Sequence, residues 1–262
     1  MFNIFDSLVT KRIVATVSAL AVIAIGCAAG FWQLSRAHQK IAIAESLAAR
    51  QKLPALSLNT QAWTLEEVFQ RRVVARGHYI PGDSIWLDNR PRPVSKVGAD
   101  NPAQSGFYVM TPLKLEGSGT VLWVNRGWAP RNNDERTQLP PVSTPDGVVL
   151  IEGMGLAGPG KVFELGKENG LLSNPRIEQN FDLAKESSLH GWQQLPFILQ
   201  ESGHDGADGL SRDWAPPTVG VDRHYAYAFQ WFALAFSGFL FWLFSGLRQY
   251  RIGLIKREDK GE

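Results

Sequence analysis

The sequence contains five histidines, and one of them has a distinctive position. The five are His38, His78, His190, His204 and His224. His224 immediately precedes a long uncharged apolar stretch, and aromatic residues follow it, as in the aromatic belt at a membrane surface. An imidazole in that place can ligate a metal, including haem iron. An ordinary interfacial histidine that hydrogen-bonds to lipid headgroups would occupy the same position, so both interpretations stay open.

Arg126 and Trp128 form a second conspicuous pair. They lie in residues 123–130, WVNRGWAP, which carry a predicted strand into a turn. Arginine stacks on indole rings and donates to backbone carbonyls, and Gly127 can take dihedral angles that other residues avoid. The pattern therefore favours a structural corner of a domain.

Other kinds of chemistry find little support in the sequence. Cys27 is the only cysteine, which excludes a thiol oxidoreductase and a cysteine-based copper chaperone. There is no GxSxG, HExxH or P-loop motif. Residues 153–158 spell GxGxxG, but Pro159 follows and no βαβ pattern surrounds them, so a dinucleotide site is not expected. The loop at 204–208, HDGAD, is either a weak metal site or a flexible linker.

Two uncharged apolar stretches are long enough to cross a bilayer. Residues 13–34 would extend about 33 Å as a helix, close to the hydrocarbon thickness of a membrane. Residues 225–247 form a second such stretch. We therefore predict transmembrane helices at 13–34 and 225–247. A cleaved signal peptide, with Cys27 at a lipoprotein cleavage site, is the alternative for the first stretch.

The charges indicate how the chain is oriented. The 27 Lys+Arg against 25 Asp+Glu give a net charge of +2, which does not indicate nucleic-acid binding. Residues 35–223 hold 20 basic and 21 acidic residues, so the excess of basic residues lies in the tails at 1–12 and 248–262. Short basic flanks stay in the cytoplasm. We expect both termini in the cytoplasm, residues 35–224 as a periplasmic domain, and a bacterial inner membrane.

The segment between the spans predicts a β-rich domain. The helical spacing of apolar residues over 35–52 indicates that the first helix continues outward until Pro54, and Thr64 with Glu67 forms a capping box that opens a short helix. Alternating strands bounded by Gly and Pro predict a small barrel or sandwich. The strands are expected at 73–80, 84–89, 106–112, 120–126, 148–154 and 195–200, with the first two and the next two paired as hairpins.

Four short motifs occur in order along the chain. Residues 30–40 match GxWQxxRxxxK, the central strands carry GHY and TPL, residues 124–130 match VNRGWVP except at Ala129, and residues 222–231 are close to NxHLxYAxxW. In the last motif Asp222 replaces Asn and Tyr225 replaces Leu, so the polar partner of His224 could differ here. This combination resembles the surfeit locus protein 1 family, the Shy-type cytochrome c oxidase assembly factors. The family-motif residues are Gly30, Trp32, Gln33, Arg36, Lys40, Gly77, Tyr79, Arg90, Pro112, Asn125, Arg126, Gly127, Trp128 and Pro130.

The resemblance implies a function that the residues alone did not reach. Family members are two-span inner-membrane proteins that assist assembly of haem–copper oxidases, and bacterial members are thought to bind haem a and support its insertion. It implies His224 as candidate haem ligand, with Tyr227 and Trp231 as further cofactor-binding residues. The expected partners are the oxidase catalytic subunit, haem a synthase and the lipid bilayer, with no nucleic acid, no catalytic residues and no separate metal site.

Two alternatives from other classes remain. One is a structural membrane scaffold that holds oxidase intermediates without binding haem. The other is a membrane-anchored periplasmic enzyme, although no nucleophile–base set is recognisable. A transporter is not expected, because neither span carries a charge that could line an ion path.

Overall fold

The computed structural model describes residues 12–93, 104–132, 135, 138–163, 175–203, 208–214 and 220–258. The tail up to residue 11, most of the expected loop 91–104 and residues 204–207 lie outside the described residues. The chain divides into two compact units, Met1–Glu45 with Thr218–Glu262, and Ser46–Pro217. The second unit is shorter at both ends than the expected domain of residues 35–224.

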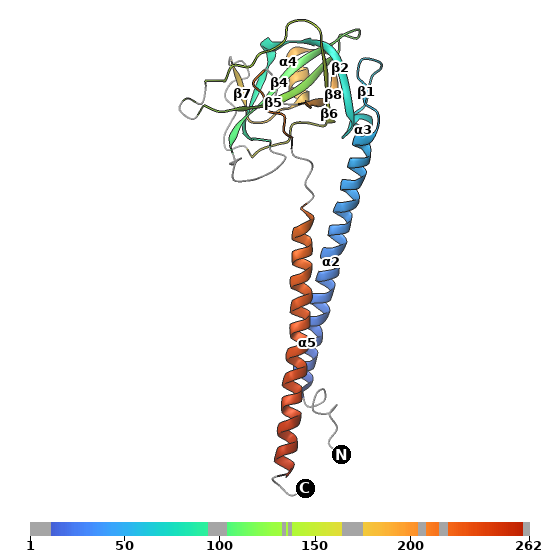
Figure 1. The fold of residues 1–262 in the computed structure, drawn as a ribbon, viewed down its shortest axis with the longest axis vertical. Coiled ribbons are helices and arrows are strands. Elements are labelled where there is room, and N and C mark those ends of the chain that lie inside the picture. Colours follow the sequence, from blue (N-terminus) through green and yellow to red (C-terminus); the bar gives the residue numbers. More distant parts are fainter. Residues whose placement is uncertain are drawn as a thin grey trace. The chain divides into compact units, whose positions relative to one another are not determined.

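The first unit is built on two long helices (Figure 1). Helix α2 runs from Ile13 to Lys52 without a break, so the span and the segment expected to extend it form one helix. Helix α5 runs over Val221–Glu258 and begins just after Gly220, whose φ is +56°. Both are long and apolar enough to cross a membrane, and most of their apolar side chains are exposed within the protein. They are therefore candidate transmembrane helices.

Small residues let α2 and α5 approach closely. A Cβ added at Gly26 would lie 2.9 Å from Ala235 Cβ, and one at Gly30 would lie 2.6 Å from the Phe232 ring. Ala228 is also buried. Small residues at helix interfaces are typical of membrane helices, because association there depends on close packing. The two helices therefore pack as a pair.

A polar contact joins the helices near the start of α2. Arg12 donates from Nη2 to Ser245 Oγ at 2.8 Å, and Trp242 Nε1 donates to Thr16 Oγ1 at 3.0 Å. The beginning of α2 thus lies against the later part of α5, so the helices are antiparallel (Figure 1).

The second unit is a β-barrel with additional strands. Within the described residues the strands form one sheet in the order β1-β2-β6-β8-β5-β4-β3-β7, and a further pairing of β2 with β4 closes five of them into a ring. The expected β-rich fold is confirmed, and of its two forms the barrel is correct. The strands are β1 Leu56–Ser57, β2 Arg72–Tyr79, β3 Ile85–Pro91, β4 Ser105–Leu115, β5 Val121–Pro130, β6 Val149–Leu156, β7 Arg176–Glu178 and β8 Gln194–Glu201.

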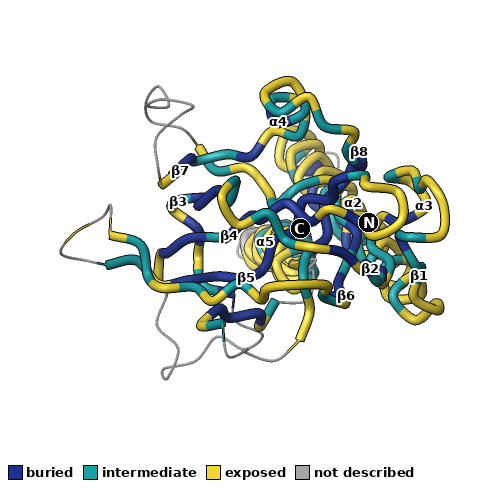
Figure 2. Tube along the Cα trace, turned by 90° about the horizontal axis from the view of Figure 1, so that it is seen from above, coloured by how far each residue is buried: buried dark blue, intermediate teal, exposed yellow. Residues whose placement is uncertain are grey.

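The buried residues lie on both faces of the barrel wall. Leu122 and Val124 of β5 belong to a cluster that draws on all five closed strands, which places that cluster inside the barrel. Trp123, between them, points to the other face and packs with Phe181 and Ile198. Nine of the ten residues of β5 are therefore buried, and β4 and β5 are mostly dark blue in Figure 2.

One of the two predicted hairpins is wrong. Strands β2 and β3 do not pair with each other, although a turn at Pro81–Asp83 connects them. Instead β3 pairs with Gly106–Met110 at the beginning of β4, and β2 pairs with Leu113–Leu115 at its end. Closing the ring uses the edge of β2 that a hairpin would need. The second hairpin, β4 with β5, is confirmed, with Lys114 opposite Val121.

In the described part of the chain, three short helices accompany the barrel: α3 Leu65–Val68, the 3₁₀ turn η2 Pro81–Asp83, and α4 Leu183–His190. The predicted capping box of α3 is present, because the Thr64 backbone N–H donates to Glu67 Oε2 at 2.9 Å. Helix α4 was not predicted, although local signals mark both its ends. Asp182 caps its first turn, and Gly191 ends it with φ +64°.

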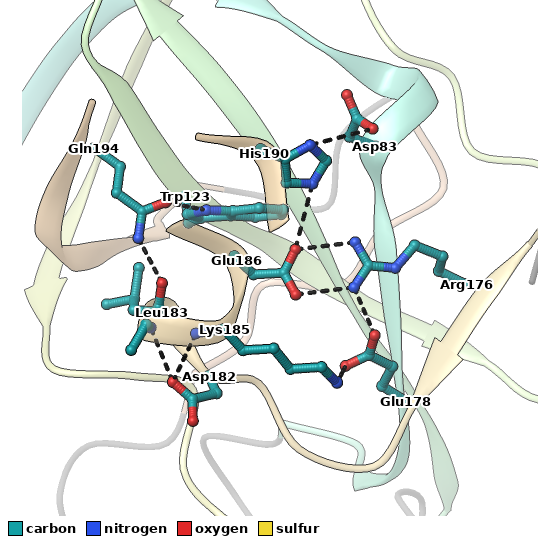
Figure 3. Close-up of polar contacts among 11 residues, drawn as sticks. Asp83, Trp123, Arg176, Glu178, Asp182, Leu183, Lys185, Glu186, His190 and Gln194 are labelled. Atoms are coloured by element: carbon teal, nitrogen blue, oxygen red, sulfur yellow. Dashed lines mark hydrogen bonds and ion pairs between the residues drawn. The ribbon is translucent and has the colours of Figure 1, made fainter. Parts of the chain in front are cut away.

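Helix α4 is held by a group of paired charges (Figure 3). Glu186 is fully buried, and its two carboxylate oxygens accept hydrogen bonds from the two Nη atoms of Arg176 at 2.8 and 2.9 Å. Arg176 also donates to Glu178, which pairs with Lys185. The hydrogen bond to Glu186 is the main reason that the pKa of Arg176 lies above its ordinary value. Each charge in the group depends on its partners.

We expect Glu186→Gln to lower the free energy of unfolding by about 2–4 kcal/mol, because it leaves Arg176 buried without its main counter-charge. Glu116→Gln is the matched control, since its pair with Arg76 is half exposed and should be worth less than about 1 kcal/mol. Urea unfolding of the full-length protein in detergent, followed by tryptophan fluorescence, measures both. Equal losses in the two variants would contradict the assignment.

Candidate functional site

The structure brings His224 against Gln33. His224 lies in the first turn of α5, and Gln33 lies on α2, one turn after Gly30. The His224 Nδ1 and Gln33 Oε1 atoms are 2.7 Å apart. The close packing at Gly30 allows this contact, because it brings the helix axes together one turn away. The polar partner of His224 is therefore an amide from the other helix.

An aromatic ring precedes Gln33 on α2, and two cations follow it. Trp32 is 55 % exposed, and the guanidinium carbon of Arg36 lies 5.6 Å from the centre of its ring. Arg36 also donates to Gln39 Oε1 at 3.0 Å. Lys40 lies one turn further and is half-buried, with Nζ 3.9 Å from the place where a Cβ on Gly220 would be. Both cations thus lie beyond Gln33 toward the beginning of α5.

Tyr227 and Trp231 lie on α5 three and seven residues after His224. This spacing places them on the same side of the helix as His224. Tyr227 is 51 % exposed, and Trp231 is half-buried, with its carbonyl against Gly26. The three side chains predicted to bind a cofactor therefore share one helix face.

The Arg126 motif belongs to the barrel and forms a separate polar cluster there. The Arg126 guanidinium carbon lies 4.9 Å from the ring centre of Tyr79, and its Nη atoms donate to Ser143 O and Thr144 Oγ1, both at 2.7 Å. Tyr79 donates its hydroxyl to Glu201 Oε2 at 3.2 Å. Burial, followed by the charge of Glu201, raises the pKa of Tyr79 well above its ordinary value, so the hydroxyl stays a neutral donor.

Two further charges complete this cluster. Asp208 pairs with both Arg126 and Arg212, and Arg212 also pairs with Glu201. Burial raises the pKa of Asp208, but the hydrogen bond and charge of Arg212 outweigh it and leave the pKa below its ordinary value. For Glu201 burial is the larger effect, so its pKa is raised. Two arginines and two carboxylates thus balance each other, which supports a structural corner.

The remaining motif residues of the barrel also have structural positions. At Gly77 a Cβ would collide with the carbonyl oxygen of Lys114, so glycine is needed where β2 meets β4 and the ring closes. Pro112 accepts a hydrogen bond from the Ile80 N–H at 2.9 Å. Pro130 is the last residue of β5.

Arg90 and Trp128 are tied together. Trp128 Nε1 donates to Arg90 O at 3.0 Å, and the Arg90 guanidinium donates to Gln179 O at 2.7 Å. Gly127 takes φ +149°, packed against Leu210. Asn125 is fully buried in β5, and its amide has no hydrogen-bond partner among the described residues.

Sequence reasoning selected Gln33 and His224 separately but not their contact, and it missed Glu201, Arg212 and the pairing of Asp208 with the arginines. The last three lie far from Arg126 in the chain, and no local pattern connects them to it. Of the loop at 204–208, for which a weak metal site and a flexible linker both stayed open, the structure describes only Asp208, which pairs with arginines. The GxGxxG segment lies in β6 and the loop after it, where Gly153 and Gly155 allow close approach of Gln200 and Val68.

We expect Asp208→Asn to destabilise the protein near neutral pH, because it removes the ion pairs with Arg126 and Arg212. The loss should be only about 1–2 kcal/mol, since Asp208 is partly exposed and water screens these pairs. The lowered pKa of Asp208 means that its stabilisation is complete above the unfolded pKa, about 3.9, and is lost as the pH falls through the lower folded value. The difference from wild type should therefore shrink below about pH 4. Urea unfolding from pH 7 to pH 2.5 tests this, with the exposed Asp146→Asn as control. A difference that stays constant over this range would contradict it.

Comparison with known proteins extends over both units. The sequence profile of the SURF1 family matches residues 20–236. Surfeit locus protein 1 of Rattus norvegicus is 25 % identical over 228 residues, which cover 81 % of this chain and 69 % of that protein. SURF1-like proteins of Rickettsia conorii and Rickettsia bellii are 27 % and 28 % identical, over 88 % and 79 % of this chain and 91 % and 80 % of their own lengths. The profile covers most of the chain and agrees with the motifs, so the chain belongs to the SURF1 family.

Proposed function

We propose that this protein is an assembly factor for haem–copper cytochrome c oxidase, and that it binds haem a through His224 and supports its insertion into the catalytic subunit. The SURF1 family is known for cytochrome oxidase assembly. The more specific role proposed here, delivery of haem a, is supported by the geometry around His224. In this proposal the chain acts by binding and transfer rather than as an enzyme.

The contact between Gln33 and His224 is the observation that carries the proposal. When Gln33 Oε1 accepts the hydrogen bond, Nδ1 of His224 carries the proton. Nε2 then keeps its lone pair, and it has no hydrogen bond within the described residues. Metal-ligating histidines usually donate their other ring N–H to an oxygen in this way, which fixes the tautomer and the ring orientation. This arrangement would leave Nε2 of His224 available to hold the haem iron.

The surroundings of His224 also suit haem. The described residues contain no group of three or more His, Cys, Asp or Glu side chains that could hold a metal ion. A single imidazole suits haem, because the porphyrin supplies the other iron ligands. Trp32 and Tyr227 expose about half of their surface, and such rings can pack on an apolar macrocycle. In this proposal haem a is the cargo of the protein and undergoes no reaction while it is bound.

A site of this kind favours release as well as binding. His224 is half-buried, so a haem bound to it would stay partly exposed and would not be enclosed by the protein. The oxidase catalytic subunit is the proposed acceptor, and haem a synthase is a possible donor in the same scheme. The proposed location is a bacterial inner membrane, with both termini in the cytoplasm and the barrel in the periplasm. The start of α2 lies against the later part of α5, which supports placing both termini on the same side of the membrane.

A scaffold without haem is the second candidate. Ala226, Ala233 and Ser237 are exposed on α5, although other small residues of the same helix are buried against α2. Exposed small residues would allow a further membrane helix to approach. Both candidates include contact with an oxidase subunit, and only the first requires the ring of His224.

We expect His224→Ala to abolish most haem a binding, because the axial ligand is removed. Gln33→Leu should weaken binding about 10–100-fold, the usual effect of losing the partner of a metal-ligating histidine. Titration of the purified protein in detergent with haem a, followed in the Soret region, measures both. His38→Ala, an exposed histidine on α2, is the control and should bind as wild type does. Unchanged haem stoichiometry in His224→Ala would exclude His224 as the ligand, whereas absence of haem binding by the wild type would favour the scaffold.

We also expect deletion of the gene to lower the a-type haem band in reduced-minus-oxidised spectra of membranes. His224→Ala supplied in place of the wild type should fail to restore the band if haem transfer is the function. Full restoration by this variant would show that assembly proceeds without haem binding here.

A further inference from the structure

Two cations on α2 near His224, Arg36 and Lys40, have no counter-charge among the residues that the structure describes. Arg36 and Lys40 follow Gln33 by three and seven residues, so all three side chains lie on one face of α2. The contacts of Arg36 are with a neutral amide, Gln39, and with the ring of Trp32. Within the described residues neither Arg36 nor Lys40 forms an ion pair. Among the described residues their charges are therefore uncompensated.

The neighbouring segments offer no carboxylate to these cations. Asp222 and Glu45 are the acidic residues nearest in sequence, and neither pairs with Arg36 or Lys40 in the described structure. Residues 215–219, which lead into α5, read APPTV and contain no acid. The positive charge is thus left for an anion from outside the chain.

The cations and the proposed iron ligand are about one helical turn apart. The Lys40 Nζ lies near Gly220, which precedes His224 by four residues, or about 6 Å along the axis of α5. On the other side of His224 both helices are uncharged over 13–34 and 225–247. The helix pair therefore presents cations, then an imidazole, then an apolar surface. A ligand with an acidic edge and an apolar body would match this order.

We propose that Arg36 and Lys40 bind the two carboxylates of the haem, an inference that rests on the proposed binding of haem at His224. Guanidinium and ammonium groups are the natural partners of carboxylates, and charge-assisted hydrogen bonds are among the strong ones. The cations hold the acidic edge of the macrocycle near Gly220, beyond the uncharged stretches of the two helices. They thereby give the bound haem one orientation out of several that a single imidazole would allow.

The test compares haem a with its dimethyl ester, which has the same macrocycle but no free carboxylates. Wild type in lipid-free detergent should bind the free acid about five- to tenfold more tightly than the ester, as expected for two partly exposed ion pairs. In Arg36→Gln with Lys40→Gln the two affinities should become equal, with the ester bound as in wild type. The same Soret signature with the ester would show that this variant is folded and that His224 still binds.

Arg248→Gln with Arg251→Gln is the matched control, because it removes two exposed cations from the other end of α5. It should keep the wild-type preference for the free acid. Equal affinities of wild type for acid and ester, or a preference retained without Arg36 and Lys40, would overturn the proposal. Those outcomes leave haem binding at His224 intact, whereas absence of binding by wild type to either compound would overturn both proposals.

Discussion

The close approach of α2 and α5 at Gly26 and Gly30 is the constraint on which the candidate site depends. It permits one alignment of the two helices, and polar contacts near both ends fit that alignment. The contacts made by Thr16 and Gln33 are 17 residues apart on α2, and their partners Trp242 and His224 are 18 apart on α5. At 1.5 Å per residue these separations are about 26 and about 27 Å, so both contacts form together. A slip of one turn would break both contacts.

The barrel depends on a different closure. Gly77 pairs with Val149 of β6 and with Leu115 of β4, so β2 joins two neighbours at one residue. The charges around Arg126 then link the strands to segments that follow much later in the chain. Buried charges stabilise only when every partner is present, because each one alone would carry the full cost of losing water. The VNRGWAP motif is thus explained by the fold of the domain and does not require a ligand there.

Local patterns predicted what local physics determines. The apolar stretches, the alternating strands, the capping box at Thr64 and the turn between β4 and β5 follow from neighbouring residues alone. Ring closure does not, which is why the predicted pairing of β2 with β3 was wrong although its turn exists. The site shows the same division. Sequence motifs selected Gln33 and His224, but these residues are 191 positions apart in the chain, and their contact depends on how the two helices pack.

The family motifs therefore fall into two groups with different physical roles. Several of those in the barrel, such as Arg126 and Trp128, are buried and hydrogen-bonded within the protein. Those on the helix pair, such as Arg36 and Trp32, are exposed and incompletely paired. A side chain that stabilises a fold gains by burial, whereas one that receives a cargo must stay accessible until the cargo arrives. Exposure also limits affinity, because water competes for every contact. For the carrier proposed here that limit is an advantage, because the cargo must be released, and one imidazole oriented by one amide would suit both binding and release.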